Sequence, residues 1–268
     1  MAQSTWLPGG GTLPSIAEIN DCWLEGAHHT EAAREAASQI AMCAPHIPYL
    51  VRSVRSLLGR VVKFLLARGV RQFLDLGAGV PAVGHIHEVA WGVDPECRIV
   101  YVDFDPAVAQ EGRTLLADND NVAYLCDDIR HPRELLDNPE LRNVLDLSRP
   151  VAVFMLQTLQ ELPDSEDPVG LVAAYSNAIS TGSYVCISHF GSKDEQLRNG
   201  LNLFGQMGFG APPAITFRDP DQLTNFFAGL ELIDPGVVPV PLWYPDSKDD
   251  IDHNPHLVPV HVGLGRKP

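Results

Sequence analysis

"RQFLDLGAGVPAVGHIHEVAW", residues 71–91, joins a short apolar run to a glycine-containing turn and then to a segment of helical character. Phe73–Leu76 is typical of a buried strand, and Gly77 and Gly79 let the chain turn sharply after it. A glycine turn also lets a ligand approach the backbone closely. The stretch therefore predicts a strand, a turn and a helix, with a ligand held at the turn.

The same alternation continues along the chain. Further strands are predicted at 98–102, 122–125, 150–156 and 183–188, and helices at 83–91, 106–117, 135–145 and 168–179. Strands that alternate with helices favour right-handed crossovers and a parallel sheet covered on both faces. Residues 237–242 and 257–264 lack a long intervening helix and predict an antiparallel hairpin at one edge. The expected fold is α/β and Rossmann-like, with a seven-stranded, mostly parallel sheet.

The amino-terminal part has a different pattern. Residues 1–14 are rich in glycine and proline and predict a flexible arm. Ser15 and Glu18 match a capping box, residues 30–37 are alanine-rich, and residues 49–68 repeat apolar side chains at steps of three and four up to a C-cap at Gly69. We expect a helical cap over residues 15–69 and a ligand-binding domain over residues 70–268.

Composition and charge exclude several function classes. The net charge of −15, from 34 acidic and 19 basic residues, disfavours nucleic acid and anionic membranes as partners. Five scattered cysteines without a CxxC pair favour a reducing cytoplasm over a disulfide scaffold or zinc knuckle. No signal peptide or apolar run of membrane-spanning length is present. His253, His256 and His261 match no zinc pattern, so no metal is expected.

The turn after the first strand does not match a dinucleotide site. Such a site wants a third glycine where Ala82 stands, which disfavours a nicotinamide-dependent oxidoreductase. The carboxylate of Asp75, just before the turn, would repel a pyrophosphate and suits a ligand that carries an ammonium group.

Acidic residues also end the next two predicted strands. Asp103 can accept hydrogen bonds from a ribose diol, and Phe104 can lie beside a base. Asp127 or Asp128 can bind an exocyclic amine, with the apolar Ile129 against the base. Parallel strands bring these ends to one edge of the sheet, where ligands bind. An ammonium, a ribose and an adenine without a phosphate describe S-adenosylmethionine.

On these residues the chain resembles class I S-adenosylmethionine-dependent methyltransferases. It is more specifically similar to the actinobacterial S-adenosyl methyltransferase family, formerly a domain of unknown function. The matching segments are "FLDLGAGVPAVGHIHEVA", "RIVYVDFDP", "LDLSRPVAVFMLQTLQELPD", "GSYVCISH", "DPGVVPVPLWYPD" and the terminal "GRKP", which cover most of residues 71–268.

The resemblance implies a set of cofactor contacts. Asp75, Gly77 and Gly79 are expected at the methionine part, Asp103 at the ribose, Phe104, Asp128 and Ile129 at the adenine, and Leu156 and Gln157 near the methionine carboxylate or the substrate.

The positions at which this chain differs from the family's sequence pattern indicate a substrate-binding region. Where the family carries Tyr-Asp-Tyr-Leu-Leu-Gly-Gly-Lys, this chain has "NDCWLEGAHH", with Trp23, Glu25 and His28 departing. Gln160 stands where relatives tend to have histidine. Asp21, Trp23 and Gln160 are the expected substrate-binding residues.

The expected reaction is methyl transfer to an O, N or C nucleophile of a small molecule such as a specialised metabolite. A reactive nucleophile needs only alignment and desolvation, whereas a hydroxyl or an acidic carbon needs a base. His189, Glu161 and His85 are the candidate catalytic residues. The alternative is a protein that binds S-adenosylmethionine without transferring methyl, as a sensor, regulatory subunit or cofactor-assisted cyclase. The sequence leaves open whether the protein is a monomer or a homodimer.

Overall fold

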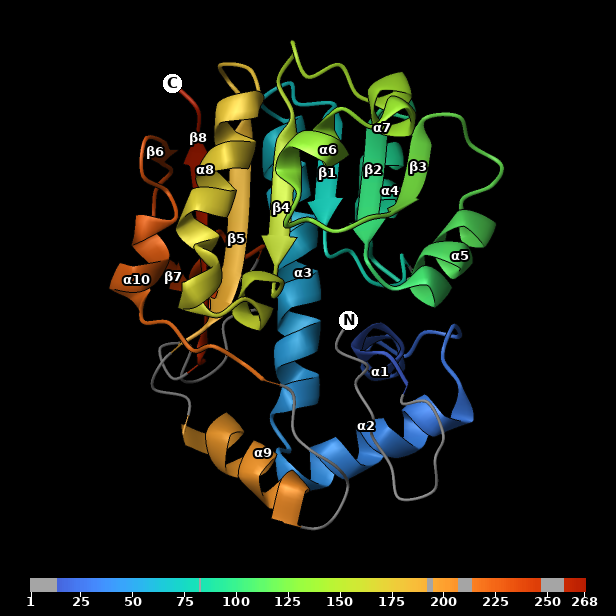
Figure 1. Ribbon diagram of the computed structural model, residues 1–268, viewed down its shortest axis with the longest axis vertical. Coiled ribbons are helices and arrows are strands. Elements are labelled where there is room, and N and C mark those ends of the chain that lie inside the picture. The colour runs from blue at the N-terminus through green and yellow to red at the C-terminus, as the bar shows by residue number, and fades with distance from the viewer. Residues whose placement is uncertain (1–13, 82, 192–194, 207–213, 247–257) are drawn as a thin grey trace.

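The computed structural model describes residues 14–81, 83–191, 195–206, 214–246 and 258–268. Its centre is one twisted sheet with the strand order β3-β2-β1-β4-β5-β8-β6 (Figure 1). The bounds are β1 Gln72–Leu76, β2 Arg98–Asp103, β3 Val122–Cys126, β4 Ala152–Leu156, β5 Tyr184–Phe190, β6 Glu231–Leu232, β7 Val238–Pro239 and β8 Val260–Arg266. Strands β1 to β5 are parallel, and β8 runs antiparallel to β5, β6 and β7. The predicted mostly parallel α/β fold with an antiparallel edge is confirmed.

Alternating strand side chains build two hydrophobic clusters, one on each face of the sheet. The first cluster includes Phe73, Tyr101 and Phe154 and packs against α3 (Ile47–Leu66), α4 (Ile86–Trp91) and α5 (Pro106–Leu115). The second includes Leu74, Val102 and Met155 and packs against α6 (Pro132–Leu136), α7 (Pro139–Val144), α8 (Pro168–Ala178) and α10 (Pro220–Asn225). Helices on both faces explain why the parallel strands are mostly apolar.

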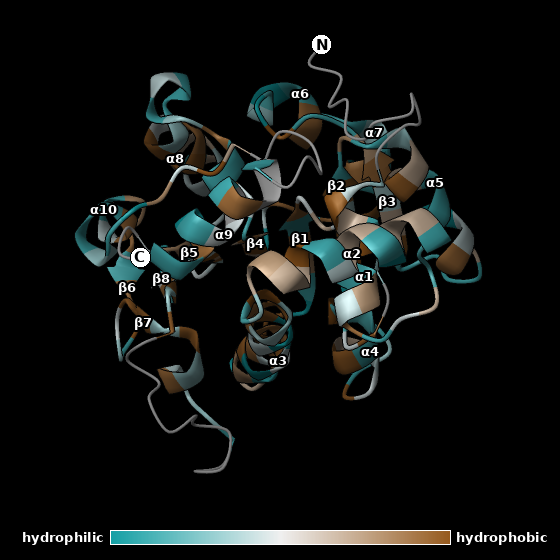
Figure 2. Cartoon of the chain, turned by 90° about the horizontal axis from the view of Figure 1, so that it is seen from below, coloured by the Kyte–Doolittle hydropathy of each residue, from teal (hydrophilic) through white to brown (hydrophobic). Residues whose placement is uncertain are grey.

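Three helices lie across the carboxyl ends of the strands. These are α1 (Ile16–Trp23), α2 (Glu31–Cys43) and α9 (Glu195–Gln206), which lie below the arrowheads of β1, β2 and β4 in Figure 1. Seen from below, α1 and α2 lie on the side of β1, β2 and β3, and α9 lies on the side of β4 and β5 (Figure 2). The predicted capping box is present: the Glu18 amide donates to Ser15 Oγ, and the Ser15 amide donates to Glu18 Oε2.

Two elements differ from the sequence prediction. The helix expected over residues 135–145 is two helices, α6 and α7, because Asn138 caps a new helix that starts at Pro139. At the sheet edge, β7 is followed at once by a 3₁₀ turn, Val240–Leu242, and the two-residue β6 was not predicted. Residues 247–257, next to the predicted second hairpin strand, fall outside the described residues.

The division of the chain into an arm, a cap and a domain stays a prediction. Residues 1–13 of the expected arm lie outside the described residues. In the expected cap, α1 and α2 share a small cluster of their own, whereas α3 shares the cluster on the sheet face. None of the helices in the described ranges is long and apolar enough to cross a bilayer.

Candidate functional site

The acidic residues that end three successive strands lie at one edge, as predicted. Strands β3, β2 and β1 are neighbours and parallel, and β4 follows β1 on its other side. The chain therefore reverses its direction of winding between β1 and β4, which is where open α/β sheets place their ligands. Among these acidic residues at the strand ends, Asp75 is the most buried, with 4% of its surface exposed. Burial raises its pKa to about 7, and the charge of Asp103 adds to this while Arg55 opposes it.

The glycine turn after β1 is held by hydrogen bonds from several directions. The amides of Gly77 and Ala78 both donate to the carbonyl of Val102, at 2.9 and 3.0 Å. The amide of Gly79 donates to Asp103 Oδ2 at 3.0 Å, and Tyr124 donates its hydroxyl to the Gly79 carbonyl at 2.6 Å. The turn thus presents a fixed backbone surface beside two carboxylates.

His85 also supports this turn. Its Nδ1 accepts a hydrogen bond from the Ile86 amide at 3.1 Å, which leaves Nε2 to donate to the carbonyl of Ala78 at 3.3 Å. Burial lowers the pKa of His85 well below its usual range, so the ring is neutral at neutral pH. Both ring nitrogens are engaged by the backbone, and a catalytic role for His85 stays a prediction.

Gly77 has a left-handed backbone, and its replacement tests how tightly the turn is packed. A Cβ here would lie 2.5 Å from Thr158 Cγ2, at φ +78°. Gly69 offers a matched control, because it has φ +82° and no atom within 4 Å of the added Cβ. We expect Gly69→Ala to cost about 1–2 kcal/mol in the free energy of unfolding, and Gly77→Ala about 1–3 kcal/mol more. Equilibrium urea denaturation measures both losses. Equal losses in the two variants would show that the turn accommodates the added methyl group without strain against Thr158.

Asp103 ends β2 and contacts the glycine turn, and Phe104 is the next residue along the chain. Asp103 is half-buried; its Oδ1 accepts from the Asp105 amide at 3.0 Å, while its Oδ2 accepts from Gly79. Burial raises the pKa of Asp103. Phe104 exposes 69% of its surface, so its ring is available to stack with a planar group. These positions suit the ribose and adenine contacts predicted for them.

The end of β3 is organised by an arginine that the sequence analysis did not single out. Arg130 binds both oxygens of Asp128 through Nε and Nη2, at 2.6–3.0 Å, and lowers the pKa of that carboxyl. The carbonyl of Ile129 accepts from the Tyr175 hydroxyl at 2.7 Å. Asp127 uses one oxygen to accept from the Asp128 amide. The assignment of Asp128 and Ile129 to the adenine stays a prediction.

The chain after β4 brings a further carboxylate toward Asp103. Leu156 ends β4, and Gln157 has a left-handed backbone, φ +61°, with its amide donating to Ser188. Glu161 ends the 3₁₀ turn Leu159–Glu161 and is accessible to solvent. Nearby protein atoms nevertheless desolvate part of its carboxyl group, and this desolvation, followed by the charge of Asp103, raises its pKa to about 7. Asp103 therefore acts electrostatically on both Asp75 and Glu161.

His189 lies in the interior of β5 in a network built by Arg218. Arg218 Nη1 donates to His189 Nε2 at 2.7 Å, so Nδ1 carries the ring proton and donates to the Phe190 carbonyl. Arg218 also donates to the carbonyls of Leu159 and Leu162 and to Asp164. Burial lowers the pKa of His189 to about 4. Its use as a catalytic base stays a prediction.

The buried Arg218 should be sensitive to a change that keeps its charge. Arg218→Lys loses the planar fork that joins three acceptors in residues 159–164 to a fourth in β5, and we expect a loss of about 2 kcal/mol in unfolding free energy. Arg130→Lys is the matched control at an exposed pair, with an expected loss below about 1 kcal/mol. Thermal and urea denaturation measure the difference, and indistinguishable variants would refute the structural importance of the Arg218 network.

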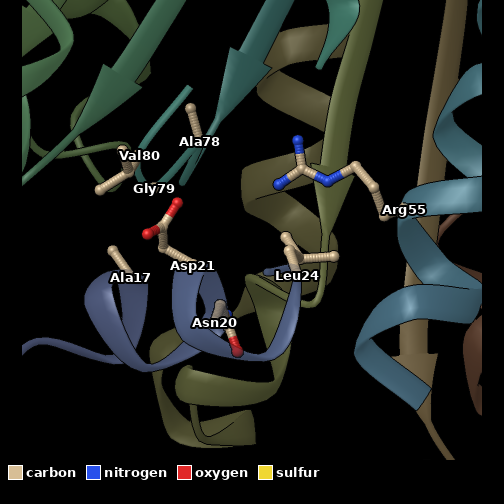
Figure 3. A pocket seen from close by; sticks show the side chains of 8 residues that line it. All are labelled: Ala17, Asn20, Asp21, Leu24, Arg55, Ala78, Gly79 and Val80. Carbon is tan, nitrogen blue, oxygen red and sulfur yellow. The ribbon is translucent and has the colours of Figure 1, made fainter. Parts of the chain in front are cut away.

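Two of the expected substrate-binding residues carry buried oxygens without a hydrogen-bond partner among the described residues, Asp21 Oδ1 and Gln160 Oε1. Asp21 lies in α1, and its other oxygen accepts from the His28 amide at 2.8 Å and contacts His29 Nδ1 at 2.9 Å. Trp23 is half-buried between the cluster of α1 and α2 and the first sheet cluster. Figure 3 shows a pocket between α1 and the glycine turn, with Asp21 and Arg55 pointing into it.

Within the described ranges, no group of three or more His, Cys, Asp or Glu side chains is placed to hold a metal ion. His261 lies in β8, where burial lowers its pKa. His253 and His256 fall outside the described residues.

The chain resembles known proteins over nearly its whole length. A family model described as S-adenosyl methyltransferase matches residues 11–268. A solved DUF574-family protein from Streptomyces avermitilis shares 32% identity at a TM-score of 0.84, covering 95% of this chain and 97% of its own. A solved protein described as a putative methyltransferase, from Thermobifida fusca, shares 35% identity at a TM-score of 0.84, covering 98% of this chain and 99% of its own. NodS, an N-methyltransferase from Bradyrhizobium japonicum solved with S-adenosyl-L-homocysteine, shares the fold alone, at 14% identity and a TM-score of 0.50 over 82% of this chain and 88% of its own. No curated protein is significantly similar to the chain.

Proposed function

Because this chain belongs to the S-adenosyl methyltransferase family and S-adenosylmethionine is its cofactor, we propose that it transfers the cofactor's methyl group to an O, N or C nucleophile of a small molecule. The observation that carries this proposal is a group of three carboxylates: Asp75 and Asp103 lie at the glycine turn, and Glu161 lies within the field of Asp103. Desolvation raises all three pKa values, and the charge of Asp103 adds to the shift at Asp75 and at Glu161. A site of this charge favours a ligand that carries positive charge, as a sulfonium with an ammonium group does.

The residues present fit this cofactor. The left-handed glycines 77 and 79 shape the turn. A Cβ at Gly79 would lie 3.5 Å from Ala17 Cβ, beside the pocket that both residues line, whereas a Cβ at Gly77 would meet Thr158. Asp103 offers the acceptor for a ribose diol, and Phe104 offers an exposed ring for the adenine. Asp128 and Ile129 would complete the adenine site, with Leu156 and Gln157 near the methionine or the substrate.

When bound, the cofactor supplies a methyl group on a positively charged sulfur, which leaves as a neutral thioether. The protein's part is to orient the two reactants and to exclude water. Of the three candidate bases, Glu161 is the one with an accessible carboxylate, and the bound cation keeps that carboxylate ionised and able to accept a proton. We therefore assign Glu161 Oε as the acceptor of the proton that the nucleophile loses.

Charge and architecture support a small-molecule substrate. The net charge of −15 opposes a nucleic-acid backbone. Helices α1, α2 and α9 lie across the edge that carries the site, which restricts access by a large, rigid partner (Figure 1). The proposal extends to a specialised metabolite as the methyl acceptor, bound near Trp23 and Gln160.

The test is methyl transfer from labelled S-adenosylmethionine to fractionated metabolite extracts, with total RNA as a parallel acceptor. We expect S-adenosylhomocysteine and one labelled small molecule to form together. Glu161→Gln should slow transfer to a hydroxyl or carbon acceptor about 10² fold or more while cofactor binding persists. Transfer to RNA alone would overturn the small-molecule proposal, and binding without turnover on any acceptor would favour the sensor or regulatory alternative.

A further inference from the structure

A pocket lies between helix α1 and the glycine turn, beside the carboxylates already described. Its walls include the turn residues Ala78, Gly79 and Val80, together with Leu24 at the end of α1. Asp21 and Arg55 are its two ionisable side chains, and they enter from different helices (Figure 3). The pocket therefore combines one negative and one positive group at opposite ends of a short gap.

Arg55 reaches the pocket from α3. Its guanidinium lies in the field of four ionisable groups, of which Asp75 has the largest effect and Asp21 the smallest. The aliphatic part of the side chain passes Gly84, where an added Cβ would lie 3.5 Å from Arg55 Cγ. A guanidinium carries five N–H donors in a planar fork, so it can serve Asp75 and a ligand carboxylate at the same time.

Asp21 enters the pocket from α1, fixed in position by the loop that follows. Its Oδ2 accepts from His28 and contacts His29, while its Oδ1 is buried without a hydrogen-bond partner among the described residues. The residue exposes 3% of its surface. A buried carboxylate oxygen without a donor is costly, and a ligand that donates to it removes that cost.

We propose that this pocket binds the amino-acid end of S-adenosylmethionine, with Arg55 on the α-carboxylate and Asp21 on the α-ammonium. The inference rests on the proposed function and makes Asp21 a cofactor residue where the sequence suggested a substrate residue. It also gives the amino-terminal helices a role in holding the cofactor. The zwitterion would meet one partner of opposite charge at each end, in a space closed by α1.

A plainer role for Arg55 is to neutralise the buried Asp75 without touching any ligand. The two roles differ in what they predict for ligands that lack the amino-acid end. S-adenosylhomocysteine and 5′-methylthioadenosine share the adenosine and a neutral thioether, but only the former carries the α-amino and α-carboxylate groups. A residue that acts on the amino-acid end affects the first ligand alone.

The experiment is calorimetric titration of the full-length protein with both ligands and with S-adenosylmethionine. In wild-type protein, S-adenosylhomocysteine should bind at least about 10-fold more tightly than 5′-methylthioadenosine. Arg55→Ala should remove most of this difference and leave the Kd of 5′-methylthioadenosine within about 2-fold. The matched control is Lys63→Ala, which removes one positive charge from an exposed position on the same helix.

Asp21→Asn tests the ammonium contact separately. The asparagine oxygen can replace Oδ2 at the His28 amide, which places an NH₂ donor where the unpaired oxygen was. S-adenosylhomocysteine should then bind about 10-fold more weakly, with 5′-methylthioadenosine unchanged. Gly26→Ala gives an independent variant, because its Cβ would overlap Asp21 Oδ1.

Equal weakening of both ligands by Arg55→Ala, or no weakening of either, would overturn the proposal and leave the methyltransferase function standing. The same holds if wild-type protein binds both ligands equally. Failure of wild-type protein to bind any of the three nucleosides would contradict the proposed function itself. Melting temperatures of all variants show whether each is folded, and the ratio of the two ligand affinities is independent of the folded fraction.

Discussion

Asp103→Ala is expected to weaken S-adenosylmethionine binding about 100-fold, the largest effect of any single change at the site. A carboxylate that accepts from both hydroxyls of a ribose forms two charge-assisted hydrogen bonds, and their loss costs about 3 kcal/mol. The substitution also removes the acceptor of the Gly79 amide, at 3.0 Å, and so loosens the glycine turn. Calorimetric titration measures the affinity, and the loss should extend to 5′-methylthioadenosine because that ligand keeps the ribose.

Two variants separate the causes of this loss. Asp103→Asn keeps an acceptor for Gly79 and should recover part of the affinity, since the hydrogen bonds persist without the charge. Asp118→Ala removes one exposed acidic charge in the segment between α5 and β3 and should leave binding unchanged. Unaltered affinity in Asp103→Ala would place the ribose elsewhere and would refute the assignment of the β2 end.

The sequence predicted which strand ends meet at one edge of the sheet, because local pattern and parallel topology determine this. Asp75, Asp103 and Asp128 each follow an apolar run, and neighbouring parallel strands must bring such ends to one edge. Pro139 after Asn138 was a local signal for a helix break, and the leucines and valine on either side of it suggested one continuous helix over residues 135–145.

Long-range partners could not be read from the sequence. Arg55 precedes Asp75 by twenty positions on a helix whose basic residues look like a solvated face. Arg218 meets His189 across segments that carry no motif, and the engagement of both nitrogens of His85 depends on the folded turn. Such contacts arise from tertiary packing, which strand and helix periodicity do not encode.

The affinity for S-adenosylmethionine is expected to fall about 10-fold for each participating carboxylate as the pH is lowered from about 8 to about 6. Asp75 and Glu161 both have a pKa of about 7 in the cofactor-free protein. A bound cation favours their ionised forms and lowers both pKa values, so binding releases protons in this pH range. The two groups together give about a 100-fold change, and S-adenosylhomocysteine, which lacks the sulfonium charge, should change less.

Titrations in buffers of different ionisation enthalpy count the released protons, and Asp75→Asn and Glu161→Gln should each remove about one of them.

The stability of the cofactor-free protein should change with pH in the opposite direction to the cofactor affinity. The pKa of Asp75 is raised in the folded state above its ordinary value of 3.8. Between about pH 4 and about pH 7 the folded protein therefore binds more protons than the unfolded chain, and its stability falls as the pH rises through this window. The site therefore binds the cation best at the pH at which its ionised carboxylates most destabilise the cofactor-free protein. A cofactor affinity that does not vary between about pH 6 and about pH 8 would show that neither carboxylate faces the sulfonium.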